Sequence, residues 1–305
     1  MSFTTTSSGF YLTDTEHSLF ASETDSYTEP QMLALDDGNV LVSCTVTHAD
    51  GTSDVVARVF TADWTPVSAE FTVNSYLTGN QGTPEMTLLE NGNVVLTWTS
   101  EGEDGDGNGV YARILAPDGS AVTEEIAVNS YTTGAQEQPL ITALAGGDFL
   151  VSWTSRGQDG SGGGVYAQRF NADGTADGSE FRINDVTLGI QENLALHPLA
   201  DGGFAVAWGQ DYANNAWITA YADDGTVITS FQTDLTVNQM GGLRFNDFLP
   251  LADGSFLLGW NHSTFFRYLH TYSDVLVQRY ESDGTPVSSE IILSVDGYDF
   301  AFYGP

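Results

Sequence analysis

The chain has 305 residues, with 41 acidic residues against 8 basic ones, all of them arginine, for a formal net charge of −33 at pH 7. Such a charge repels nucleic-acid phosphates and anionic lipid headgroups, so we expect neither as a partner. A hydrophobic fraction of 41% predicts a folded chain, and the single cysteine, Cys44, excludes an intrachain disulfide and a cysteine metal site.

The N-terminal residues 1–17 show neither the basic nor the apolar segment of a cleaved signal peptide. No apolar run approaches the roughly 18 residues of a membrane-spanning helix. We therefore expect a location outside the cell, or on a cell or particle surface, reached without a cleaved signal peptide. Residues 295–305 are acidic and then aromatic, which favours type I secretion, with particle release as the alternative.

An internal repeat fills the chain from residue 18 to residue 294. The segment Phe-Thr-Val-Asn-Ser-Tyr-Leu-Thr-Gly-Asn-Gln begins at Phe71, and related copies begin 55 and 110 residues later, at Ile126 and Phe181. One large residue marks the same place in an apolar run of each copy, a cysteine in the first and a tryptophan afterwards: Cys44, Trp98, Trp153, Trp208 and Trp260. The spacing defines five units, 18–74, 75–129, 130–184, 185–234 and 235–294, between end segments 1–17 and 295–305.

Each unit is predicted to form four short strands, which in the second unit are 85–89, 93–100, 110–115 and 125–129. Asn-Gly and Asp-Gly pairs recur between the first and second strands and between the third and fourth, because they accept the positive φ of tight hairpins. The first unit departs from this pattern at the second turn, with Asp63-Trp64. No amphipathic helix is predicted.

Four antiparallel strands in a repeat of 52–55 residues predict an all-β chain that folds as a single β-propeller of five blades. An array of β-sandwiches or an open solenoid is the alternative. The repeated tryptophans are expected to pack between blades. Residues 10–13 and 290–294 both resemble a fourth strand, and one of them should complete the last blade.

The repeat pattern also resembles a known group of proteins. Its clearest copy carries Asp-Gly-Ser-Gly-Gly-Gly-Val-Tyr-Ala-Gln-Arg-Phe at 159–170, and Val-Asn-x-x-x-x-Gly-x-Gln precedes the first strand of the earlier units. These motifs resemble the propeller-type repeats of large secreted proteobacterial proteins of the RTX and adhesin kind. The resemblance covers residues 18–294, fades in the last two units, and implies an extracellular setting without implying an enzyme activity.

A loop in the second unit is a candidate calcium site. Asp104, Asp106 and Asn108 alternate with glycines, so their side-chain oxygens could converge on one hard cation. The twelfth position, which is Glu in an EF-hand, is Leu115 here, so the loop is not an EF-hand. The alternative is a glycine-rich surface hairpin. Ca²⁺ is the one cofactor that the sequence predicts.

Five carboxylates near the first strand of each unit form a second candidate site, at the mouth of a central channel: Glu29, Glu85, Glu137, Glu192 and Asp247. They stand at three different distances from the tryptophan position, so their register disagrees. Paired carboxylates can hydrolyse glycosides. We expect a channel-mouth cation or ligand site in preference to catalysis.

Aromatic residues in the last two units form a third candidate, because flat rings stack on sugars while Arg, His and Tyr supply polar contacts. The predicted ligand-binding residues are Phe265, Phe266, Arg267, Tyr268, His270, Tyr272, Tyr212 and Trp217. The alternative is that this divergent loop covers a blade edge. A metal held by His262 and His270 is a further interpretation.

These features predict a non-catalytic binding module that recognises a cell-surface polysaccharide, in an adhesin or phage-like spike or fibre role. The expected partner is a cell-surface glycan or a particle or surface protein. One alternative is a calcium-stabilised propeller with a structural or assembly role. The other is a polysaccharide-active enzyme, in which Glu137→Gln or Glu192→Gln would abolish activity.

Overall fold

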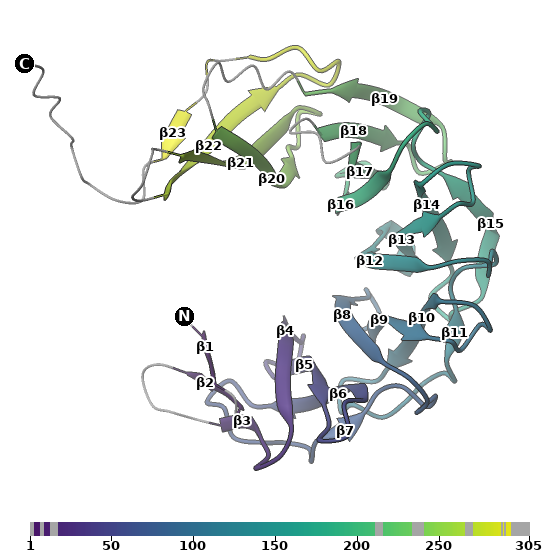
Figure 1. Cartoon of the computed structure of the whole chain (residues 1–305), viewed down its shortest axis with the longest axis vertical. Helices are drawn as coiled ribbons and strands as arrows, with labels where there is room; N and C mark the ends of the chain where they lie inside the picture. Colours follow the sequence, from purple (N-terminus) through teal and green to yellow (C-terminus); the bar gives the residue numbers. More distant parts are fainter. Residues whose placement is uncertain are drawn as a thin grey trace, which may run out of the picture. The chain divides into compact units, whose positions relative to one another are not determined.

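The computed structural model describes residues 3–6, 9–12, 18–210, 216–233, 241–265, 271–287, 289 and 291–293. Within this part the chain forms antiparallel sheets (Figure 1), and its one helical element is the 3₁₀ turn η1 (Ala145–Gly147). The chain divides into two compact units, Met1–Leu196 and His197–Pro305.

The strands follow chain order within every sheet. The three-stranded N-terminal sheet contains β1 (Phe3–Thr6), β2 (Gly9–Leu12) and β3 (Ser18–Ala21). The first and second four-stranded sheets are β4 (Ser26–Ala34), β5 (Val40–Thr47), β6 (Ser53–Phe60), β7 (Phe71–Thr72), and β8 (Gln81–Leu88), β9 (Val94–Glu101), β10 (Asn108–Leu115), β11 (Ile126–Ala127). The third is β12 (Gln136–Ala143), β13 (Phe149–Arg156), β14 (Gly163–Phe170), β15 (Ala176–Arg182). The fourth is β16 (Gln191–Pro198), β17 (Phe204–Gln210), β18 (Ala216–Tyr221), β19 (Val227–Gln232), and the fifth is β20 (Gly241–Pro250), β21 (Phe256–Phe265), β22 (Thr271–Tyr280), β23 (Ile291–Leu293).

These five four-stranded antiparallel sheets confirm the predicted fold class, an all-β propeller of five blades. We call the sheets blades 1 to 5 and the strands of each blade A to D. In blade 2 each predicted strand overlaps one of β8 to β11, and the largest difference is that strand A begins four residues earlier than predicted. The difference arises because a β-bulge between Gly82 and Glu85 lets the strand continue past Pro84.

In some blades, the turn glycine between strands C and D has a packing role in addition to its positive φ. Gly119 has a φ of +85°, and a Cβ atom added there would lie 2.7 Å from the ring of Phe71 in the preceding blade. Glycine is therefore required twice over, by backbone conformation and by close contact. Blade 1 has Trp64 at the equivalent position, with a φ of 67°, and its ring packs at 6.1 Å from that of Phe60.

The repeated tryptophans are core residues, as predicted. Trp98, Trp153, Trp208 and Trp260 are fully buried. Trp98 lies in one apolar cluster with Leu41 and Val59 of blade 1, so it packs between blades. The residue that replaces it in blade 1, Cys44, packs in a cluster with Leu19 and Phe20 of the N-terminal sheet, where the phenylalanine ring supplies apolar volume.

The Val-Asn…Gln motif of the repeat joins each of the first three blades to the chain that leads into the next. The buried Asn74 accepts a hydrogen bond from the backbone N–H of Val55 (2.8 Å) and donates to the carbonyl of Tyr76 (2.9 Å). The equivalent residues, Asn129 and Asn184, repeat both contacts. Asn184 also donates to Oε1 of the fully buried Gln191 at 3.2 Å. The motif is therefore a structural link that satisfies buried backbone groups.

The two chain ends have different roles. Strand β23, within the predicted segment 290–294, pairs with β22 and completes blade 5. Residues 10–12 lie instead in β2 of the N-terminal sheet. Phe20 of that sheet and Tyr27 of β4 stand where the repeat places Asn74 and Gln81, and their rings stack with centroids 5.5 Å apart. A stacked aromatic pair thus replaces the amide link ahead of blade 1.

Candidate functional site

The A strands of blades 1 to 3 share a β-bulge with a strained residue. Glu29, Thr83 and Gln138 occupy the same repeat position and have φ values of 53°, 53° and 55°. Each precedes a proline, and the ladder register shifts at each of them. Positive φ in non-glycine residues is costly, about 1–3 kcal/mol, and such positions cluster at functional sites. The bulges therefore mark the A-strand side chains around Glu29, Thr83 and Gln138 as a candidate functional site.

Glu29 connects the bulges of blades 1 and 2. Its Oε2 atom accepts one hydrogen bond from Thr45 Oγ1 and another from the backbone N–H of Thr83, both 2.8 Å long. The remaining oxygen, Oε1, lies on an exposed residue. The carboxylate is thus fixed through its Oε2 atom by two donors.

Glu85 follows the bulge of blade 2 by two residues and is half-buried. Burial, followed by the negative charge of Glu29, raises the pKa of Glu85 to about 7. Its Oε1 accepts a 3.0 Å hydrogen bond from the amide nitrogen of Gln31 on β4. A carboxyl group with this pKa exchanges its proton near neutral pH, as a general acid must.

The carboxylates of blades 3 and 4 have a cationic partner instead. Arg156, at the end of β13, donates from Nε to Glu137 Oε2 at 3.2 Å, and its Nη2 atom lies 3.8 Å from Glu192 Oε1. These two carboxylates precede the bulge position, whereas Glu29 occupies it. The structure therefore separates the predicted row into two pairs: Glu29 and Glu85, which form no ion pair with a described arginine, and Glu137 and Glu192, which Arg156 bridges.

Asp247 of the second unit has a histidine partner. Its Oδ1 atom lies 2.8 Å from Nε2 of His197 and accepts a hydrogen bond from the backbone N–H of Phe248, also 2.8 Å long. Burial acts to raise the pKa of Asp247, but the hydrogen bond and charge of His197 and the Phe248 amide outweigh it, so this pKa lies below its ordinary value.

The two aspartates of the predicted calcium loop accept hydrogen bonds from backbone N–H groups. Asp104 Oδ1 accepts from the N–H of Asp106 (3.2 Å), and Asp106 Oδ2 accepts from the N–H of Gly134 (3.1 Å), while Asn108 begins β10. Within the described residues, no three His, Cys, Asp or Glu side chains are grouped as metal ligands. Calcium binding stays a prediction.

Most of the predicted aromatic site falls outside the described residues, namely Phe266, Arg267, Tyr268, His270 and Tyr212. Phe265 ends β21 and Tyr272 lies in β22. Trp217 is half-buried and stacks on Trp208 of the neighbouring strand, with ring centroids 5.1 Å apart and planes 5° from parallel. Trp217, one of the predicted ligand-binding residues, therefore packs against a side chain of its own blade.

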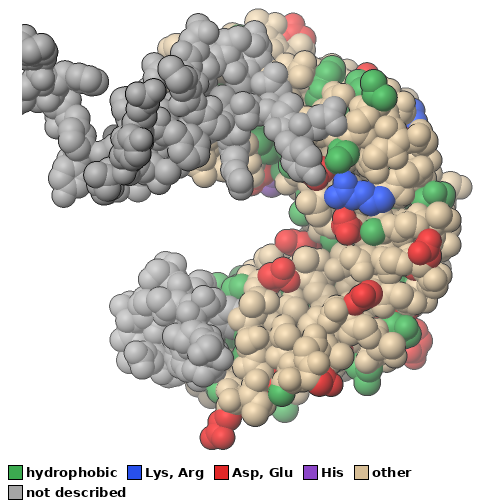
Figure 2. Space-filling view, viewed as in Figure 1, with side chains coloured by type: hydrophobic (Ala, Val, Ile, Leu, Met, Phe, Trp, Pro, Cys, Tyr) green, Lys and Arg blue, Asp and Glu red, His purple; other side chains and the backbone are tan. Residues whose placement is uncertain are grey.

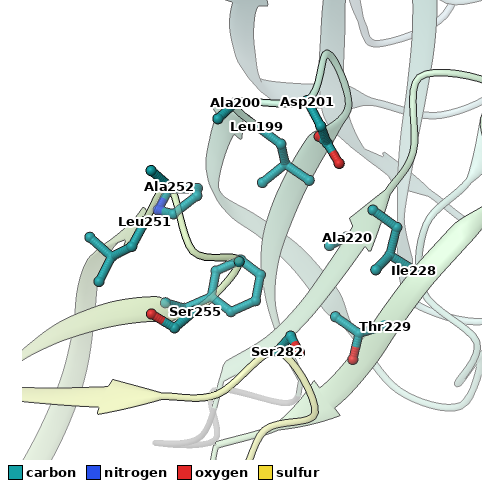
Figure 3. A pocket seen from close by; sticks show the side chains of 13 residues that line it. Leu199, Ala200, Asp201, Ala220, Ile228, Thr229, Leu251, Ala252, Ser255 and Ser282 are labelled. Carbon is teal, nitrogen blue, oxygen red and sulfur yellow. The ribbon is translucent and has the colours of Figure 1, made fainter.

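The second unit contains a cavity of about 160 Å³ between the turns of blades 4 and 5 (Figure 3). Much of its apolar lining comes from Leu199, Ile228, Leu251 and Phe256, and Asp201 is the one charged side chain among the described lining residues. The lining residue Ala220 stands where blades 1 and 2 have Val59 and Ile114, which leaves room for the cavity. The part of its lining that the structure describes holds no second carboxylate for acid–base chemistry.

Charge on the described surface follows the composition. Acidic side chains are spread over the face shown in Figure 2, and basic ones occur at few places. No helix within the described ranges is long and apolar enough to cross a membrane.

Four residues of this site were not predicted from the sequence: Gln31, Thr45, Thr83 and Arg156. The Glu-Pro, Thr-Pro and Gln-Pro pairs at equivalent places in three strands were the available signal for the bulges.

No family model and no curated protein matches the sequence. Among solved structures, a protein of unknown function from Dyadobacter fermentans is 14% identical, with 91% of this chain and 85% of that chain covered and a TM-score of 0.56. A family 43 β-1,3-galactosidase is 12% identical, covering 90% of this chain and 95% of that one at a TM-score of 0.49. A family 43 β-xylosidase/α-arabinofuranosidase from a compost metagenome is 10% identical, covering 85% and 93% at a TM-score of 0.47.

The comparison corrects one prediction. The sequence predicted a non-catalytic module with an adhesin or spike role, whereas the similar structures include named glycoside hydrolases. The physical reason for the error is that the prediction treated the five carboxylates as one misaligned set and did not recognise the pair at Glu29 and Glu85. At these identities the likeness concerns the fold, so an activity must be argued from this chain's own residues.

Proposed function

We propose that the chain hydrolyses a glycosidic bond, with Glu85 as the general acid and Glu29 as its carboxylate partner. The observation that carries the proposal is the half-buried Glu85, whose pKa is raised to about 7 by burial and by Glu29. Two carboxyl groups in environments that separate their proton affinities are the requirement for this chemistry.

The two groups have complementary tasks in that reaction. Protonated Glu85 donates its proton to the leaving glycosidic oxygen as the bond from that oxygen to the anomeric carbon breaks. Glu29, held through Oε2 by Thr45 and Thr83, acts through its other oxygen on the opposite side of the reaction. That oxygen either takes a proton from the attacking water or attacks the anomeric carbon itself.

Carbohydrate substrates are supported by two observations. The names of similar structures refer to galactosidase, xylosidase and arabinofuranosidase activities, which are statements about those proteins. The Glu29–Glu85 pair supplies the reacting groups in this chain. We propose a polysaccharide on a cell surface as the partner and a location outside the cell, in keeping with the acidic composition.

Activity on a panel of polysaccharides and aryl glycosides, compared among three variants, tests the proposal. Glu85→Gln and Glu29→Gln should each lower kcat at least about 100-fold, because removal of a general acid or base costs that much. Glu137→Gln is the matched control, since Arg156 already bridges that carboxylate to its neighbour. Equal losses in all three variants, or none in Glu85→Gln, would contradict the proposal.

A further inference from the structure

Gln31 occupies the position in blade 1 that Glu85 occupies in blade 2, two residues beyond the bulge in each strand. The two side chains meet across the strands β4 and β8, where Gln31 Nε2 donates to Glu85 Oε1 at 3.0 Å. In the other blades the same position holds Leu140, Ala195 and Asp247. An amide donor aimed at the carboxyl group is therefore particular to this pair of blades.

We infer that Gln31 is a positioning residue that occupies Oε1 of Glu85 and reserves Oε2 as the oxygen that carries the proton. The inference rests on the proposed function. An amide N–H can only donate, so the oxygen that faces it must accept, in either protonation state of the carboxyl group. The proton of the neutral form therefore belongs on the other oxygen.

Among the described residues, few other groups near Glu85 could donate a hydrogen bond to its carboxyl group. The charged residue that acts on it is Glu29 of β4, which carries no donor when ionised. On the other neighbouring A strand, β12, Glu137 is engaged by Arg156. The strand partner in β9 is Thr97, whose hydroxyl donates to the carbonyl of Tyr111.

Gln31 also opposes the raised pKa of its partner. A donor to a carboxylate favours the ionised form, so Gln31 lowers the pKa that burial and Glu29 raise. Removal of the donor should raise the pKa of Glu85 further and leave its carboxyl group free to rotate. The proton would then be distributed over both oxygens, one of which is turned away from the substrate.

The test uses Gln31→Met, which keeps the length of the side chain and removes the donor. The control, Gln138→Met, makes the same exchange on the A strand of blade 3, where the amide oxygen accepts from Thr154. Carboxyl ¹³C NMR titration of the full chain, assigned with Glu85→Gln, reports the pKa of Glu85 without any substrate. The rate of hydrolysis against pH reports the same group in the reaction.

In Gln31→Met the pKa of Glu85 should rise by about one pH unit, the value of a hydrogen bond to a charged group. The alkaline limb of the rate profile should move with it, and kcat should fall roughly 10-fold with KM unchanged. The control should match the wild type in all three. An active enzyme in which Gln31→Met leaves the pKa, the profile and kcat unchanged would overturn the inference alone. A shifted pKa in a protein that hydrolyses nothing would instead overturn the proposed function.

Discussion

The backbone N–H of Thr83 donates a 2.8 Å hydrogen bond to Oε2 of Glu29, so the strained bulge of blade 2 holds the carboxylate of blade 1. At the equivalent position of blade 4, the N–H of Asn193 donates instead to Thr154 Oγ1 on strand B of blade 3, at 2.9 Å. Between blades 1 and 2, the contact from strand A to strand A therefore holds a carboxylate in place.

The raised pKa of Glu85 makes stability depend on pH. Its pKa of about 7 exceeds the value of 4.5 for an ordinary glutamate, so the folded state binds the proton more tightly than the unfolded state. This stabilisation is complete below pH 4.5 and is lost as the pH rises to about 7. Urea unfolding of Glu85→Gln and the wild type should show the variant gaining roughly 2 kcal/mol relative to the wild type between pH 5 and pH 8. A constant difference would contradict the assignment.

Gly119 should tolerate alanine less well than Gly225, although both are turn glycines with φ near +80°. Gly225 has no atom within 4 Å of an added Cβ, whereas Gly119 would have Phe71 at 2.7 Å. We expect Gly225→Ala to cost about 1 kcal/mol from backbone conformation and Gly119→Ala about 2–3 kcal/mol with the added clash. Thermal or urea unfolding measures both. Equal costs would show that the contact has no energetic role.

The buried amide of Asn184 should matter far more than an exposed one. Asn184→Ala removes the acceptor for the N–H of Val165 and a donor to Gln191, leaving buried polar groups unpaired at a cost of about 2–4 kcal/mol. Asn171→Ala, in an exposed turn, removes contacts to Thr175 and should cost less than about 1 kcal/mol. Chemical denaturation of both variants checks the difference, which must vanish if the repeated asparagine is not a structural link.

Calcium binding by the loop at Asp104–Asn108 can be tested with one substitution, because the equivalent loop of blade 3 shows which residue preserves its structure. Ser161 stands where blade 2 has Asp106, and it accepts from Gly189 N–H at 3.0 Å, as Asp106 accepts from Gly134. Asp106→Ser therefore keeps the loop contact and removes a carboxylate. If calcium binds here, calorimetric titration gives heat with the wild type that is lost in the variant. Identical traces for the two proteins would exclude this loop.

The repeat predicted the fold because each of its signals has a local cause. Trp98 marks an interblade core position and Gly119 a turn, and both are visible as spacings in the sequence. The carboxylate site was less visible. Glu29 and Glu85 occupy different repeat positions, and their proximity depends on the bulges in β4 and β8. The prolines after Glu29 and Thr83 indicate an irregular strand but do not determine the geometry of the bulge. Arg156 could not be assigned to Glu137 and Glu192 from spacing, because three strand ends from two blades meet there.

The central claim is that Glu85 delivers the proton that cleaves a glycosidic bond, and the dependence of kcat/KM on pH tests it most directly. For a hydrolysed glycan, we predict that the rate falls above about pH 7, where Glu85 ionises, and that Glu85→Gln removes both this alkaline limb and most of the activity. A wild-type rate that stays constant from pH 6 to pH 9, or a Glu85→Gln variant with the wild-type rate and profile, would contradict it.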